Sequence, residues 1–239
     1  MASLTVKDYH VGWICALSKE MTAAKVMLDV IHGRAESVRA GDSNAYEYGR
    51  IHDHNVVIAV LPKGVDGTTA AAIVAKDMAR SFPALRMMLM VGIGGGIPNL
   101  PKIDIRLGDI VVGTPEGTWG GVVQYDKGKA EDGGIFVPKG QLSQPPNLLL
   151  NAIAALAASH DMTDSLVSTY LKQAQEKHPK IVEKGYTLPD KPDILYCSKC
   201  DMSVESIKSH ARRVTLYGRN AKAVPLKFTT VSSHQGIRL

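Results

Sequence analysis

Glu20 is the first residue whose type and position could do chemistry. It lies about one helical turn beyond the apolar run 9–17, which predicts a buried strand. In open α/β sheets, ligands bind just beyond the carboxyl ends of strands, and a carboxylate held there can orient or deprotonate a water molecule. The alternative is structural, because a glutamate in the first turn of a helix often only complements the helix dipole.

A run of glycines behind the apolar segment 85–91 is the second candidate. Four of the five residues at 92–96 are glycine, namely Gly92, Gly94, Gly95 and Gly96. A tight turn with positive φ angles explains one or two of them, whereas three in a row favour bare backbone against which something packs. A dinucleotide fingerprint would need glycine in place of Ile97 and a helix behind it, and a P-loop would need G-K-[ST]. The sequence therefore favours a binding floor for another kind of ligand.

The loop 63–69 is a candidate for binding an anion. Lys63, the loop amides and the hydroxyl groups of Thr68 and Thr69 could together hold a phosphate at the start of the following helix. Capping of that helix by Thr68 explains the same residues equally well.

Neither a metal ion nor a cofactor is expected. Cys197 and Cys200 have the spacing of half a zinc site, but the sequence has no second cysteine pair and only His210 nearby. The remaining cysteine, Cys15, lies in an apolar run and is expected in the core. So few cysteines, in an odd number, are typical of a reducing compartment.

The composition is that of one large globular α/β domain. Of the 239 residues, 45% are hydrophobic and 21% charged, no window is apolar enough to span a bilayer, and the first ten residues lack a signal-peptide core. The net charge of +5 is compatible with an anionic small-molecule substrate and gives little support to nucleic-acid binding. We therefore expect a cytoplasmic protein with a small-molecule ligand, and neither nucleic acid nor membrane as partner.

The order of the predicted elements positions these candidates. A helix with Ser18 as its N-cap should follow the first strand, and then a hairpin with its turn at 53–55, a helix ended by Pro83, and the strand that leads into the glycines. Later segments predict a strand at 107–113, strand-like stretches at 120–126 and 133–140, helices over 145–161 and 164–178, and an exposed loop from 179 to about 192. This order indicates an α/β fold with a mostly buried sheet.

Five segments, taken in order, resemble the nucleoside phosphorylase and nucleosidase superfamily, and in particular the purine nucleoside phosphorylase-like domains at the N-termini of many fungal proteins. They are VGWICALSKEM, VVIAVLPKGVDGTTAAA, MLMVGIGGGIPN, IRLGDIVVGTP and GGVVQYDKGK, and they cover roughly residues 9–161. The resemblance implies a three-layer α/β/α fold around a mixed, partly barrel-like central sheet. It also implies cleavage of the N-glycosidic bond of nucleosides, with phosphate or water as the nucleophile.

The resemblance assigns roles to the candidate residues. Glu20 falls where the hydrolytic members carry the glutamate that activates water. The glycine turn forms the floor under ribose and base in this family, which implies a nucleoside site lined by Ala16, Leu17, Ile93, Gly94, Gly95 and Gly96. Similar bacterial phosphorylases carry an Arg and a Ser that contact phosphate where this sequence has Met90 and Ile93. Neither residue can hold a dianion, so hydrolysis is favoured over phosphorolysis.

The late acidic motif of the family has no counterpart in this sequence. In the family, an Asp that follows a ribose-binding Glu protonates the leaving base, whereas here no acidic residue occurs after Glu205. We expect a nucleoside phosphorylase-like domain over residues 1–201, incomplete at its C-terminus, and a divergent basic tail over 202–239.

Three functions stay open on these observations. The first is hydrolysis of a purine nucleoside or nucleotide by water that Glu20 activates. The second is an inactive nucleoside- or nucleotide-binding sensor module, or a fragment of a larger fungal protein, and the third and most remote is a phosphate-dependent phosphorylase. Dimers and larger assemblies are usual in the family, which leaves a homo-oligomer open.

Overall fold

The computed structural model describes residues 4–35, 38–96, 98, 104–124, 127–140, 142–187 and 226–228. The chain divides into two compact units, Met1–Ile93 and Gly94–Leu239. The predicted boundary between residues 201 and 202, and the predicted incompleteness at the C-terminus, lie outside the described residues. The domain limits therefore stay a prediction.

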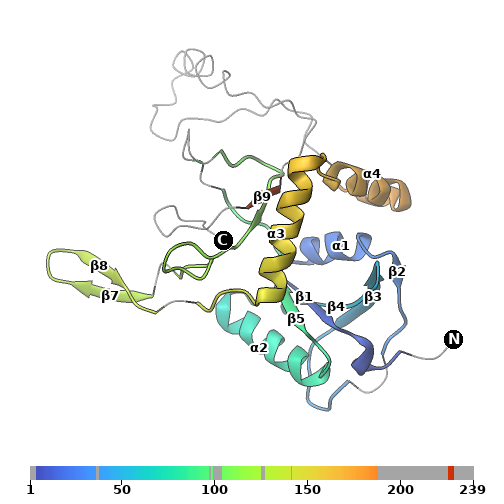
Figure 1. Ribbon diagram of the computed structural model, residues 1–239. Helices are drawn as coiled ribbons and strands as arrows, with labels where there is room; N and C mark the ends of the chain where they lie inside the picture. The colour runs from blue at the N-terminus through green and yellow to red at the C-terminus, as the bar shows by residue number, and fades with distance from the viewer. Residues whose placement is uncertain are drawn as a thin grey trace. The chain divides into compact units, whose positions relative to one another are not determined.

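A five-stranded mixed sheet forms the centre of the first unit (Figure 1). Its strands are β1 (Val11–Cys15), β2 (Val30–Ile31), β3 (Tyr46–Ile51), β4 (His54–Val60) and β5 (Met87–Met90). They lie in the order β2-β3-β4-β1-β5, with β1 parallel to both β4 and β5, and β3 antiparallel to both β2 and β4. A short 3-10 helix, Val6–Asp8, precedes β1.

Two helices, α1 (Ser18–Val26) and α2 (Gly67–Ser81), pack on opposite faces of this sheet. Successive residues of a strand point to opposite faces, so the two core clusters divide β4 between them. The cluster under α2 contains Val57, Ala59, Ala70, Val74 and Met78. The cluster under α1 contains Val56, Ile58, Ala24 and Leu28. The predicted α/β class, with helices on both sides of a mixed sheet, is confirmed.

Two boundaries in this unit differ from the sequence prediction by one or two residues. Helix α1 begins at Ser18 with Leu17 as its N-cap, so Ser18 is not the cap. The turn between β3 and β4 lies at His52 and Asp53, where His52 takes a left-handed φ of 49°. Neither shift changes the order of strands and helices.

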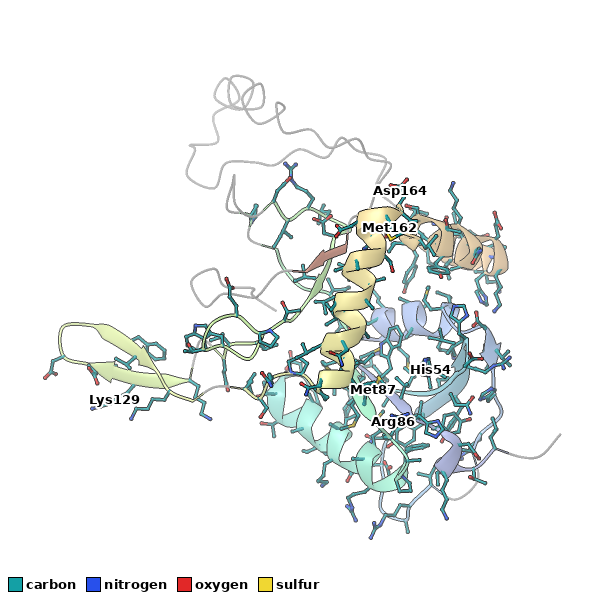
Figure 2. All side chains as sticks on the ribbon, in the orientation of Figure 1. His54, Arg86, Met87, Lys129, Met162 and Asp164 are labelled. Carbon is teal, nitrogen blue, oxygen red and sulfur yellow. The ribbon has the colours of Figure 1, made fainter. Side chains whose placement is uncertain are left out.

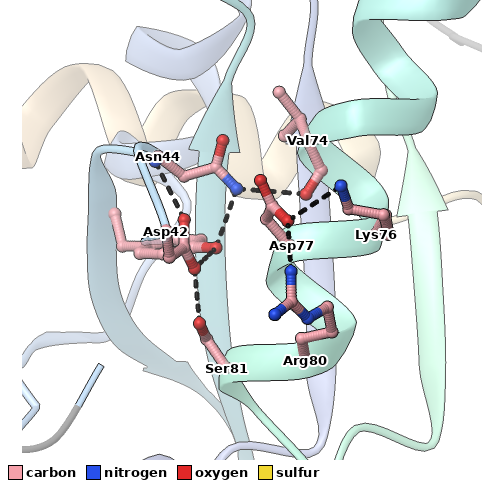
Figure 3. Close-up of polar contacts among 8 residues, drawn as sticks. Asp42, Asn44, Val74, Lys76, Asp77, Arg80 and Ser81 are labelled. Atoms are coloured by element: carbon pink, nitrogen blue, oxygen red, sulfur yellow. Dashed lines mark hydrogen bonds and ion pairs between the residues drawn. The ribbon is translucent and has the colours of Figure 1, made fainter. Parts of the chain in front are cut away.

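A polar cluster ties the loop before β3 to α2 (Figure 3). The carboxylate of Asp42 accepts hydrogen bonds from the backbone N–H of Asn44 (2.9 Å), the hydroxyl of Tyr46 (2.8 Å) and the hydroxyl of Ser81. The side-chain amide of Asn44 also donates to the backbone carbonyl of Val74 in α2 (3.1 Å). Hydrogen bonds as well as apolar packing therefore hold α2 in place.

The second unit contains the other described elements. They are the parallel pair β6 (Ile110–Val112) and β9 (Leu226–Phe228), the hairpin of β7 (Gly128–Glu131) and β8 (Ile135–Pro138), and the helices α3 (Asn147–Met162), α4 (Val167–Lys177) and α5 (Pro179–Glu183). The predicted strand near 107–113 and both predicted long helices are confirmed. None of the helices in the described part of the chain is long and apolar enough to cross a membrane.

Two predictions in this unit are wrong. The stretch 120–124 is not a strand, and Gly121 in it takes a φ of 104°, far from the negative φ of regular strands. The segment from Pro179 begins with a short helix rather than a loop, since proline is well suited to the first helical position and Ile181 finds a buried environment.

Candidate active site

Three parallel strands end at one edge of the five-stranded sheet. β1 runs between β4 and β5, and Cys15 at the end of β1 lies opposite Val60 at the end of β4. The amino ends of β4 and β5, where His54 and Met87 lie, are at the other edge (Figure 2). The chain leaves the carboxyl edge through the segments that the sequence singles out, which are 16–20, 61–69 and 91–93.

Glu20 lies at this edge, and its carboxylate is held by backbone amides. The residue is 8% exposed. Its Oε2 accepts hydrogen bonds from the N–H groups of Ala16 (2.7 Å) and Leu17 (2.9 Å), and its Oε1 accepts one from the N–H of Ile93 (2.8 Å). The bond from Leu17 is the one that a glutamate at the third helical position makes to its N-cap. Glu20 therefore joins the β1–α1 turn to the end of β5.

These bonds leave one acceptor position on the carboxylate. A carboxylate has about four lone-pair positions, two on each oxygen. Oε2 accepts two hydrogen bonds and Oε1 accepts one, so a further donor such as water has its place on Oε1. This geometry suits a carboxylate that orients one water molecule, and it equally suits a purely structural link between two turns.

Side chains of this chain pack against Gly92 and Gly96, so neither position has room for a side chain of its own. A Cβ atom on Gly92 would lie 2.8 Å from Oε1 of Glu20, and one on Gly96 would lie 2.5 Å from Cγ2 of Ile105. Neither glycine has a φ in the left-handed region, so a tight turn is not the reason for either one. The close approach that the glycine run suggests is present at these two positions.

The structure brings Ala16, Leu17, Glu20 and Ile93 together. The first two and Ile93 reach Glu20 through their backbones, while the side chains of Leu17 and Ile93 are 52% and 66% exposed. The other predicted nucleoside-site residues, 94–96, follow Ile93 directly, are exposed, and belong to the second unit. Apolar side chains beside a few polar groups are the usual lining of a small-molecule site.

The candidate anion-binding residues follow β4 at the same edge. Lys63, Thr68 and Thr69 are exposed, and the two threonines lie in the first turn of α2. The N-cap of that helix is Asp66, so the capping role considered for Thr68 is not the one it has. Binding of an anion by these three residues stays a prediction.

The thiol of Cys15, beside Glu20, is not set up as a nucleophile. Burial, and next the charge of Glu20, raise the pKa of this thiol to about 11. A thiol that is protonated at neutral pH is a poor nucleophile, because the thiolate is the reactive form. In the described part of the chain, no group of three or more His, Cys, Asp or Glu residues could hold a metal ion.

Sequence analysis did not predict the contacts that Gly92 and the Ile93 amide make with Glu20. The bond from Leu17 has a sequence signal, a glutamate three residues after a helix N-cap. The bond from Ile93 spans 73 positions, and no spacing rule connects the two residues.

Comparison with known proteins identifies a relative in sequence and several solved structures. No family model matches the chain. A nucleotide-binding leucine-rich repeat (NLR)-like protein of Hyaloscypha variabilis is 47% identical over 191 residues, which are 80% of this chain and 18% of the relative. The chain thus spans about a fifth of the length of that protein.

The solved structures are similar at lower identity. A 5'-methylthioadenosine/S-adenosylhomocysteine nucleosidase of Neisseria meningitidis, in complex with methylthio-immucillin-A, is 18% identical with a TM-score of 0.45, covering 71% of this chain and 72% of that one. A variant nucleosidase of Helicobacter pylori with 5'-methylthioadenosine in its active site is 19% identical with a TM-score of 0.44, covering 64% and 60%. This chain is similar to each of them over part of its length.

Proposed function

We propose that this chain cleaves the N-glycosidic bond of a purine nucleoside or nucleotide, with water activated by Glu20 as the nucleophile. The observation that supports the proposal is the buried Glu20 carboxylate at the carboxyl edge of the sheet, fixed by three amides and with one acceptor position left on Oε1. The five sequence segments that resemble nucleoside phosphorylases and nucleosidases include this carboxylate and the turn that it contacts.

In this reaction a bond from the anomeric carbon to oxygen replaces the bond to the base nitrogen. Water bound to Oε1 of Glu20 gives up a proton to this carboxylate as its oxygen attacks the anomeric carbon, and the electron pair of the broken bond leaves with the base, which takes up a proton from solvent. The sugar acquires oxocarbenium character in the transition state. A carboxylate already fixed by amides stabilises that positive charge without having to reorganise.

The surroundings of Glu20 suggest how substrate is held. The exposed apolar side chains of Leu17 and Ile93 would form the floor under ribose and base. Lys63 and the hydroxyl groups after it would hold a phosphate group of a nucleotide. Met90 and Ile93 offer neither charge nor hydroxyl to a phosphate nucleophile, which favours water.

A non-catalytic nucleoside- or nucleotide-binding module is the second candidate. One observation favours it: the amide bonds to Glu20 are also those of a structural link. Similarity to less than a fifth of a longer protein also fits a module within a larger chain.

Free-base release from adenosine, methylthioadenosine and ATP, measured by chromatography with and without phosphate, tests the proposal. We expect release that is independent of phosphate and falls at least about 10²-fold in Glu20→Gln, as loss of a general base predicts. The control is Glu47→Gln, the same change at a half-exposed glutamate of β3 that pairs with Lys25, and it should leave the rate unchanged.

Other outcomes decide between the alternatives. Release that requires phosphate would show a phosphorylase. A folded chain that binds a nucleoside in calorimetry but releases no base would overturn catalysis and support the binding module. A folded chain that neither binds nor cleaves any of the three compounds would overturn both candidates.

A further inference from the structure

We propose that Gly92 is a positioning residue for the Glu20 carboxylate, because its missing side chain leaves the space in which that carboxylate bridges the β1–α1 turn and the end of β5. The inference rests on the proposed function in one respect, since it identifies what places the catalytic base. The contact itself exists without substrate and can be tested without it.

The space behind Gly92 is filled by the whole carboxylate group. A Cβ atom on Gly92 would lie 2.8 Å from Oε1, 3.1 Å from Cδ and 3.2 Å from Oε2 of Glu20. Carbon–carbon and carbon–oxygen contacts of optimal energy are near 3.5 Å or longer, so these distances are repulsive. An alanine at position 92 and the carboxylate cannot both keep their places.

The carboxylate is the group that has to move. The backbone before Gly92 is tied to β1, because the N–H of Val91 donates to the carbonyl of Ile14 (3.0 Å) as an extension of the β1–β5 pairing. Oε1 is the atom nearest to the added carbon, and it is the atom that accepts the bond from Ile93. Displacement therefore breaks the Ile93 bond first, while Ala16 and Leu17 still donate to Oε2.

The backbone conformation gives no separate reason for glycine at this position. The φ of Gly92 is outside the left-handed region, so alanine can adopt it without strain. Gly33 is a matched control, since its φ is also outside that region and an added Cβ would have no neighbour within 4 Å. Gly92→Ala therefore measures the contact with Glu20.

The consequence for the site is a loss of orientation. The Ile93 amide fixes Oε1, and Oε1 carries the acceptor position left for water. When the carboxylate shifts, the water is no longer held in the direction of attack, so kcat should fall with little change in KM. A change in KM alone would indicate a role in holding substrate instead.

Hydrogen exchange of individual amides, followed by NMR on the full chain, is the decisive experiment. We expect Gly92→Ala to speed exchange of the Ile93 amide by about tenfold, as loss of one bond to a charged acceptor predicts. The amides of Ala16 and Leu17 should change less, and Gly33→Ala should change none of the three. In a Glu20→Ala background, adding Gly92→Ala should have no further effect, because no carboxylate is left to displace.

Two results would overturn the proposal. One is wild-type exchange at Ile93 in Gly92→Ala, and the other is an acceleration that persists in full in the Glu20→Ala background. If Gly92→Ala alone prevents folding, the double variant should regain the urea midpoint of Glu20→Ala, and a lower midpoint would equally contradict the proposal. Since none of these measurements uses substrate, an inactive wild type would refute the proposed function and leave this test intact.

Discussion

Replacing Glu20 by alanine should destabilise the folded chain by an amount that its hydrogen bonds predict. The substitution removes three bonds of 2.7, 2.9 and 2.8 Å to backbone amides. At about 1.5–3 kcal/mol for each hydrogen bond to a charged acceptor, the loss before any replacement by water is about 4.5–9 kcal/mol. A favourable interaction of the carboxylate with the N-terminus of α1 adds about 0.3–1 kcal/mol.

Exposure of the donor amides to water reduces this loss of stability. Leu17 and Ile93 have exposed side chains, so water can reach their amides once the carboxylate is gone. Replacement by water recovers part of each bond, and we expect a net loss of about 2–4 kcal/mol in the free energy of unfolding. Glu20→Gln should lie between wild type and Glu20→Ala, because a carboxamide has one acceptor oxygen and can serve Ala16 and Leu17 but not Ile93.

Urea unfolding followed by circular dichroism measures this loss in the intact chain. Glu47→Ala is the reference, since its ion pair with Lys25 (2.7 Å) is more than a third exposed and should contribute no more than about 1 kcal/mol. A loss in Glu20→Ala no greater than that in Glu47→Ala would refute the inference that the three amide bonds hold the site together.

Three further predictions concern the layers around the sheet. Burial, and next the charge of Arg50, lower the pKa of His32 below its ordinary value of 6.5. The contribution of neutral His32 to stability should therefore be complete above about pH 6.5 and decline as the pH falls through the folded-state pKa. In His32→Gln, a plot of urea midpoint against pH should have a smaller slope in this range. Gly49→Ala would place a Cβ atom 2.7 Å from the backbone carbonyl oxygen of Val30, which cannot move aside as a side chain can. Urea unfolding should show a free energy of unfolding lower by about 1–3 kcal/mol. The Asp42 carboxylate accepts three hydrogen bonds, whereas the carboxamide in Asp42→Asn has one acceptor oxygen. Limited proteolysis within 38–45 should therefore be faster than in wild type. An unchanged cleavage rate would show that packing alone holds this loop.

The strands that position the site could be predicted because they are continuous apolar runs. β1 and β4 are buried on both faces of the sheet, and such strands contain few polar residues to interrupt the pattern. The stretch that includes Gly121 also contains strand-forming residues, Val122 and Val123, yet its backbone takes a positive φ at Gly121. Apolar patterns therefore identified buried strands, and they failed where a glycine turns the chain.

Glu20 could be predicted as a candidate site residue from the order of a strand and a helix. Its partners were harder to predict, because Ile93 contributes only a backbone N–H, which every residue except proline possesses. The space behind Gly92 likewise depends on where a side chain 72 positions earlier lies, and that is settled by the pairing of β1 with β5. Local patterns therefore pointed to Glu20 on one side of the candidate site, and tertiary packing supplies the contacts on the other side.

The two candidate functions make different demands on Glu20, and these can be separated by comparing Glu20→Gln, Glu20→Ala and Gly92→Ala. A structural link needs only the amide bonds, so affinity for a nucleoside should fall across the three variants in step with stability. A catalytic base needs in addition the open position on Oε1, pointing at the sugar. Base release should then fall steeply in all three variants, including Glu20→Gln, in which two of the bonds can persist and stability is affected less than in Glu20→Ala. A base-release rate that followed stability alone across this series would exclude water activation by Glu20 even in an active chain.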